Sequence, residues 1–317
     1  MRWGFDQEQL DFRDAVRVLL SKKCEPSTLR EASVGPLQRP VWSALADLGA
    51  LSVLVPEHQG GLGLDERSLV LLLEEAGYFG LPHPIVETAV VAMPLIGDRL
   101  PSESMVTTDL GGPLVPRMAD SDFVLLRRHG GFELVPTEDC VVTPVVTVDP
   151  ARGASRVSGA GSFIEADTGL AFDRGAWGTS AFLLGLGQRM IDDTVAYVKS
   201  RQQFGVPIGS FQAIKHHLAD AALQLTFARP AVTRAAWSLA TDDVNRTRDV
   251  SMAKVMASDA VSLISRKALQ CHGAIGYTQE YDLQLFLKRS WALSRSWGDA
   301  AWHRDRVAQQ LQLPAHT

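Results

Sequence analysis

Residues 201–220 read RQQFGVPIGSFQAIKHHLAD, a glycine-containing loop followed by the start of an amphipathic segment. On both sides of this loop, apolar residues recur at the 3.6-residue period of a helix. Four long segments of this kind run from Trp177 to Ser200, Phe211 to Ala240, Val244 to Cys271 and Gln284 to Leu311. Four long helices joined by short loops predict a four-helix bundle in residues 171–317.

The first hundred residues also carry the helical repeat. Asp6 and Gln9 have the spacing of a capping box, which predicts a helix from Asp6 to Lys23. Further helices are expected at Val41–Leu48, Ser68–Tyr78 and Ile85–Gly97. Residues 1–100 are therefore predicted to form an N-terminal α-helical domain.

The pattern changes between residues 101 and 170. Short runs of β-branched and aromatic residues alternate there with Pro, Gly and Asp, which is typical of strands and turns. The runs are Phe123–Leu126, Phe132–Val135, Cys140–Thr143 and Val145–Val148. The expected fold class is mainly α, with a small central β domain (101–170) between the helical domain and the bundle.

Composition excludes several classes of function. The net charge is −5 and basic residues are scattered among acids, which disfavours nucleic-acid binding. The first residues are too acidic for a signal peptide, and no stretch has the length and apolarity of a membrane span, so a cytoplasmic protein is expected. Three widely spaced cysteines fit neither a disulfide framework nor a zinc site, and His216 and His217 diverge on a helix, so no metal is expected.

Four motifs occur in the order and spacing of the acyl-CoA dehydrogenase family. They are VPEHQGGLGL at 55–64, RQQFG at 201–205, FQAIKHHLAD at 211–220 and QCHGAIGY at 270–277. The chain resembles that family over nearly its whole length except the β domain. The resemblance implies an oxidoreductase that acts on CH–CH bonds and desaturates an acyl-CoA between its α and β carbons.

The resemblance also implies FAD, whose pyrophosphate and adenine reach the bundle of a neighbouring subunit. The residues that match this half of the cofactor site are Arg201, Gln203, Phe204, Gln212, Gln270 and Gly273. Arginine offers a planar fork for a pyrophosphate, and glycine allows close approach of the backbone. Taken singly, each of these residues has an ordinary structural interpretation; together, in family order, they favour the cofactor.

The other half of the family's site looks absent. Nothing between residues 101 and 169 resembles the family's Thr-Glu-Pro motif or its Trp-containing strand, which hold the flavin ring. The family's Thr and Gln that bind the flavin end of the cofactor are replaced near Ala300 and Trp302. The resemblance therefore predicts a chain that cannot hold the flavin ring by itself.

The catalytic base is missing too. Removal of the α-proton needs a positioned carboxylate, and family members use a glutamate at one of two places. One place corresponds to Gly175, and the other to Trp297 or Gly298. Asp299 is the only carboxylate beside them, and an N-cap for a final helix near Ala300 is its better supported role.

Three functions remain open at this point. The first, which the resemblance favours, is a short non-catalytic subunit of the actinobacterial steroid-degrading type, inactive without a larger subunit in an α2β2 heterotetramer. FAD would be shared across the interface, and the acyl-CoA would be bulky. The second is a self-sufficient flavin dehydrogenase that uses Asp299, and the third is a scaffold that binds CoA or protein. The sequence identifies neither the acyl group, the partner nor the electron acceptor.

Overall fold

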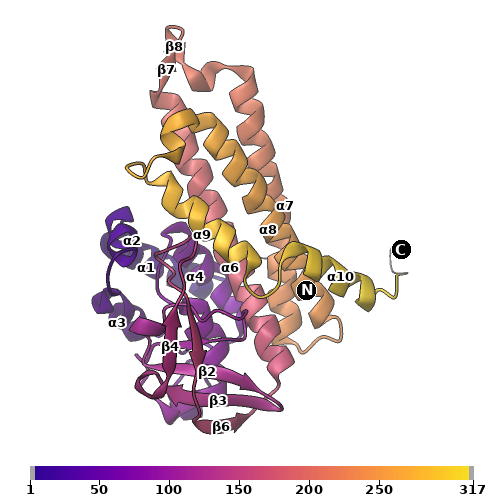
Figure 1. Cartoon of the computed structure of the whole chain (residues 1–317). Coiled ribbons are helices and arrows are strands. Elements are labelled where there is room, and N and C mark those ends of the chain that lie inside the picture. The colour runs from indigo at the N-terminus through magenta and orange to yellow at the C-terminus, as the bar shows by residue number, and fades with distance from the viewer. Residues whose placement is uncertain (1–3, 314–317) are drawn as a thin grey trace.

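The computed structural model describes residues 4–313. Helices form one end of the molecule around a small set of strands, and a long helical bundle extends away from them (Figure 1). The N-terminal helices are α1 (Gln7–Lys23), α2 (Pro26–Ala32), α3 (Arg39–Asp47), α4 (Glu66–Tyr78), a π-helix (Val86–Ala92) and α5 (Met93–Ile96). The Asp6–Gln9 capping box at the start of α1 is confirmed.

The strands lie between the N-terminal helices and the bundle in the chain. They are β1 (Val106–Thr108), β2 (Phe123–Arg128), β3 (Gly131–Pro136), β4 (Val141–Pro144), β5 (Ser155–Ser158) and β6 (Ser162–Glu165). One sheet has the order β1-β2-β3-β6, in which only the β1–β2 pair is parallel, and β4 and β5 form a separate antiparallel ribbon. The β domain is therefore small and split.

The bundle consists of long helices that pack along one another. They are α6 (Thr168–Ser200), α7 (Gln212–Ala240), α8 (Arg246–His272), α9 (Leu283–Arg295) and α10 (Ala300–Gln310). The short strands β7 (Gln202–Gln203) and β8 (Val206–Pro207) join α6 to α7 at the tip farthest from the sheet (Figure 1). The mainly α fold with a small sheet region between two helical parts is confirmed.

Two glycines allow α4 and α6 to pack backbone against backbone. A Cβ atom on Gly77 of α4 would lie 1.9 Å from the carbonyl oxygen of Phe182, and one on Gly185 of α6 would lie 1.9 Å from that of Glu74. No side chain fits at such distances. Helix α4 of the N-terminal part is thus packed closely against α6, the longest helix of the bundle.

The strands and the last helical segment differ from the expectations of the sequence pattern. Residues 145–148 form no strand, whereas β1, β5 and β6 were not expected. The last helical segment is two helices, because Trp297 and Gly298 have φ angles of 60° and 85°, and an α-helix cannot continue through such angles.

No helix within residues 4–313 combines the length and apolarity required to cross a membrane.

Candidate functional site

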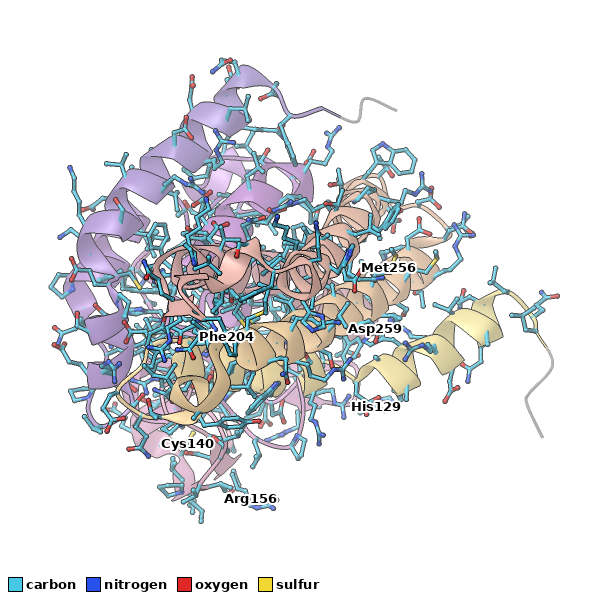
Figure 2. The ribbon with its side chains drawn as sticks, turned by 90° about the horizontal axis from the view of Figure 1, so that it is seen from above. His129, Cys140, Arg156, Phe204, Met256 and Asp259 are labelled. Atoms are coloured by element: carbon cyan, nitrogen blue, oxygen red, sulfur yellow. The ribbon has the colours of Figure 1, made fainter. Side chains whose placement is uncertain are left out.

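The β7–β8 hairpin presents the first group of predicted cofactor residues. Arg201 ends α6 by donating its backbone N–H to the carbonyl of Tyr197 at 2.8 Å. At the turn, Phe204 has a φ of 51°, and its side chain is 93% exposed. Figure 2 looks onto the molecule from this side and labels Phe204. Val206 and Phe211 beside it are also exposed, so the hairpin presents a small apolar surface that another molecule could contact.

Helix α7 begins beside this hairpin. Its N-cap, Phe211, packs its ring edge-on to Phe204 with 6.2 Å between centroids, and it provides no side-chain cap. The backbone N–H groups of Gln212, Ala213 and Ile214 therefore have no acceptor among residues 4–313. The exposed N-terminus of a long helix attracts anions through these N–H groups and the helix dipole.

The end of α8 carries the remaining predicted residues. Gln270 is exposed, and Gly273 follows the helix with a φ of 64° and open space where a Cβ would lie. The ring of His272, which lies between them, stacks on Tyr197 of α6 with 4.3 Å between centroids. Helix α8 also contacts α7 here, because Lys267 Nζ lies 2.8 Å from His217 Nδ1.

These contacts place the six predicted cofactor residues at one end of the bundle. Arg201 has no carboxylate within salt-bridge distance in the described part of the chain, so its guanidinium is free for a ligand. A free arginine beside an uncapped helix N-terminus and an open glycine suits a pyrophosphate, and exposed amides and aromatic rings suit an adenine. The residues present therefore fit the adenine end of FAD.

The two positions where the resemblance places the catalytic base are in direct contact. Trp297 is 1% exposed, and a Cβ atom on Gly175 would lie 2.4 Å from its Cζ3 atom. A Cβ on Gly111 would lie 2.9 Å from Cε2 of the same indole. The ring of Phe172 meets the indole edge-on at 6.0 Å between centroids. We name the space between Gly111 and Gly175 the indole slot, because the side chain of Trp297 fills it.

Backbone hydrogen bonds hold Trp297 in the indole slot. Its N–H donates to the carbonyl of Gly111 at 2.8 Å, and its carbonyl lies 2.7 Å from Nε2 of the buried His303. Because a carbonyl only accepts, Nε2 carries the proton. Burial lowers the pKa of His303 to about 4, so this imidazole is neutral near pH 7. The left-handed conformation of Trp297 is thus fixed from both sides.

Lys254 of α8 binds the backbone on both sides of the same turn. Its side chain is completely buried, and Nζ lies 3.3 Å, 2.9 Å and 3.1 Å from the carbonyl oxygens of Leu293, Ser294 and Gly298. Burial lowers the pKa of Lys254 to about 7, and Arg152 lowers it further, while Asp299 opposes the shift. Lys254 therefore joins the end of α9 to the residue that follows Trp297.

The pKa of Lys254 predicts a pH dependence of stability. Between pH 7 and the ordinary lysine pKa the unfolded chain binds more protons than the folded one, so the free energy of unfolding should rise with pH. The expected slope is at most ~1.4 kcal/mol per pH unit. The slope should be measured by urea unfolding between pH 7 and about 8.5. At higher pH Cys24, whose pKa is raised to about 12 in the folded chain, ionises in the unfolded chain first and lowers the free energy of unfolding.

Lys254→Met should be less stable than the wild type, because the three carbonyls lose their donor, and it should lack most of this slope. Lys22→Met, which removes an exposed lysine, is the matched control and should keep the wild-type slope. An unchanged slope in Lys254→Met would contradict the assignment.

Asp299 lies outside the indole slot. Its carboxylate accepts the backbone N–H of Trp302 at 2.9 Å and caps α10, as expected from the sequence. A different acid, Asp173, is buried two residues before Gly175, but Arg246 and Arg306 hold it, with Arg306 Nη1 at 2.6 Å. Neither carboxylate has the position of a free base beside Gly175.

Comparison with known proteins identifies the family. Profiles described as the N-terminal and C-terminal domains of acyl-CoA dehydrogenase match residues 6–98 and 166–312. Acyl-CoA dehydrogenase IpdE2 of Mycolicibacterium smegmatis is 32% identical, over 90% of this chain and 92% of that protein. The chain belongs to the acyl-CoA dehydrogenase family. Acyl-CoA dehydrogenases are FAD-dependent oxidoreductases that act on CH–CH bonds.

Solved acyl-CoA dehydrogenase structures share the fold. A chain of the ChsE4-ChsE5 complex from Mycobacterium tuberculosis superimposes with a TM-score of 0.87 at 22% identity and covers 99% of this chain and 100% of its own. A chain of the Tcur3481-Tcur3483 steroid ACAD has a TM-score of 0.86 at 22% identity, over 96% and 98%. At this identity the similarity establishes the fold alone.

Sequence reasoning missed two residues that shape the candidate site of this acyl-CoA dehydrogenase. Gly111 lies in an irregular loop after β1, and Lys254 lies within α8, so no local pattern distinguishes either one. The only signal for Lys254 was a lysine in an apolar stretch of an amphipathic helix, which usually indicates a solvated position. Both residues become informative only when the fold brings them to Trp297.

Proposed function

We propose that this chain is the non-catalytic subunit of a heteromeric acyl-CoA dehydrogenase, in which a larger subunit supplies the catalytic glutamate and the flavin-ring pocket. The observation that carries the proposal is the filled indole slot. Abstraction of an α-proton requires a carboxylate beside the thioester. Gly175 has no side chain, and the indole of Trp297 takes the space next to it.

The opposite end of the bundle supports the second part of the proposal. FAD would bind across the interface, with its pyrophosphate at Arg201 and the N-terminus of α7 and its adenine near Gln203, Phe204, Gln212, Gln270 and Gly273. The bound flavin would take the hydride that leaves the β carbon. The residues of this chain would bind and orient the pyrophosphate and adenine of the cofactor and exclude water from them. They would transfer no proton themselves.

The partner and substrate are inferred from similar proteins. The ChsE4-ChsE5 complex and the Tcur3481-Tcur3483 steroid ACAD are each named for two different subunits, and the second for a steroid. We therefore propose an α2β2 heterotetramer with one FAD for each pair of unlike subunits, acting on a bulky, steroid-derived acyl-CoA. The exposed Phe204 supports a neighbour at this end.

The proposal is tested by the ratio of FAD to protein. The chain should be purified alone and after co-expression with a candidate larger acyl-CoA dehydrogenase subunit, and the flavin absorbance and mass of each preparation measured. We expect a colourless single chain and a yellow complex with one FAD per heterodimer. Stoichiometric FAD on the chain alone would refute the proposal and favour a self-sufficient dehydrogenase, and a complex without FAD would favour a scaffold.

A further inference from the structure

A small cavity, lined in part by Thr179 one helical turn after Gly175 on α6, joins the three parts of the fold. Its volume is about 30 Å³, and its lining includes His83, Arg117, Thr179 and Arg289. His83 precedes the π-helix, Arg117 follows β1, Thr179 belongs to α6, and Arg289 belongs to α9. These side chains are at most 6% exposed. The cavity is thus the meeting point of the N-terminal helices, the β domain and the bundle.

Each of these four side chains has a buried polar atom without a hydrogen-bond partner in residues 4–313. The atoms are His83 Nδ1, Arg117 Nε, Thr179 Oγ1 and Arg289 Nη2. Arg117 Nη1 donates to the carbonyl of Ala32, and Arg289 Nη1 to that of Leu81. Arg117 Nη2 also has no hydrogen-bond partner, although it lies 3.0 Å from the carboxylate of Asp120 as an ion pair. A buried polar atom without a partner destabilises the fold, because it has lost its hydrogen bonds to water. Four such atoms around one cavity indicate a shared ligand.

The hydrogen-bonding roles of these atoms restrict the ligand. His83 Nε2 lies 3.1 Å from the carbonyl oxygen of Gln38, so Nε2 carries the proton. Burial lowers the pKa of His83 to about 4, which leaves Nδ1 as an acceptor near pH 7. Arg117 Nε and Arg289 Nη2 are donors, and the hydroxyl of Thr179 can both donate and accept a hydrogen bond. The ligand must therefore donate to His83 and accept from the two arginines.

The charges around the cavity are balanced without a ligand. Arg289 pairs with Asp149, Arg117 with Asp120 at 3.0 Å, and Arg152, which also lines the cavity, with Glu87 at 3.2 Å. Three cations and three carboxylates leave no net charge for an anion to neutralise. A halide would also meet the lone pair of His83 Nδ1, and a cation would meet the arginines.

We propose that this cavity is a specific water site, in which one or two waters bond His83, Arg117, Thr179 and Arg289 and so join the three parts of the fold. Water is both a donor and an acceptor, and a cavity of about 10–15 Å³ by this measure holds one molecule. This water, or a hydrogen-bonded pair of waters, would connect four segments that are distant in sequence. Such a site is independent of whether the chain binds FAD or a partner.

Two threonines of α6 provide a matched test. Thr194 is also fully buried, but its hydroxyl donates to the carbonyl of Met190 at 2.6 Å. Urea unfolding of the full chain should show that Thr179→Val and Thr194→Val each raise the unfolding equilibrium constant roughly 2- to 10-fold, because each loses one hydrogen bond. In a dry cavity, by contrast, removing the unpartnered hydroxyl of Thr179 should stabilise the chain. A Thr179→Val variant as stable as the wild type or more stable overturns the proposal.

A crystal structure gives a second, direct measurement. We expect a density peak within hydrogen-bond distance of the four atoms, and its loss or displacement in Thr179→Val. Soaking crystals in bromide distinguishes water from an anion, because bromide scatters anomalously. An anomalous peak in the cavity, or no density at a resolution that shows other buried waters, would overturn the assignment.

Discussion

Replacement of Trp297 by alanine is expected to lower the free energy of unfolding by about 3–5 kcal/mol, the range for a large aromatic side chain removed from a core. The indole is 1% exposed and fills the slot between Gly111 and Gly175. Trp302→Ala is the matched control, because that indole is 46% exposed and should contribute much less. Urea unfolding followed by circular dichroism measures both. Equal effects would show that Trp297 does not fill the slot.

A second substitution makes this test specific. Gly175→Ala in the wild type should be destabilising, because the added Cβ would lie 2.4 Å from Cζ3 of Trp297. In the Trp297→Ala background the same change should stabilise the chain by about 0.5–1 kcal/mol, because alanine is the better helix former. A double-mutant cycle of four proteins measures this reversal of sign. The same sign in both backgrounds would contradict the contact.

If FAD binds as proposed, loss of Arg201 should weaken FAD binding in the proposed complex roughly 10- to 100-fold, the effect of removing a hydrogen bond to a charged group of about 1.5–3 kcal/mol. The guanidinium has no carboxylate partner in the described residues, so Arg201→Ala should leave the fold intact. Arg201→Lys keeps the charge but loses the planar guanidinium, so its affinity for FAD should lie between those of the wild type and Arg201→Ala. The measurement is the dissociation constant of FAD from flavin fluorescence.

Arg304→Ala is the control for Arg201. Arg304 is an exposed arginine of α10 that pairs with Asp259, labelled in Figure 2. Its removal should change neither FAD affinity nor, beyond a fraction of a kcal/mol, stability. If Arg201→Ala binds FAD as tightly as the wild type, the pyrophosphate of the cofactor does not lie at Arg201.

The architecture was predictable where helical periodicity extends over many residues. The segments that became α6, α7 and α8 were expected within a few residues of their ends, except that α6 begins at Thr168 rather than Trp177. The break between α9 and α10 was only partly expected, from Asp299 as an N-cap. The left-handed turn itself requires Trp297 in a conformation that tryptophan rarely adopts, and no local pattern predicts that.

The candidate site likewise has a part that the sequence predicts and a part that it does not. Arg201, Gln203, Phe204, Gln212, Gln270 and Gly273 lie in short motifs, so the sequence could name them, and the fold adds that they share one end of the bundle. The filled slot was not predictable. It depends on Gly111, Gly175 and Trp297, which are far apart in the chain, and on Lys254 and His303, which fix the turn. Long-range packing of this kind leaves no local pattern.

The contact between Gly175 and Trp297 also constrains how such a chain could regain a base during evolution. A glutamate at 175 has no room while the indole is present, and a glutamate at 297 would bury a carboxylate beside Phe172 in an apolar slot. A glutamate introduced alone at either position should therefore give a poorly folded protein. Only the loss of Trp297 first, followed by a change at 175, gives an order in which the second step is tolerated. In the proposed heteromer, the division of labour between two subunits would therefore be difficult to reverse by single mutations.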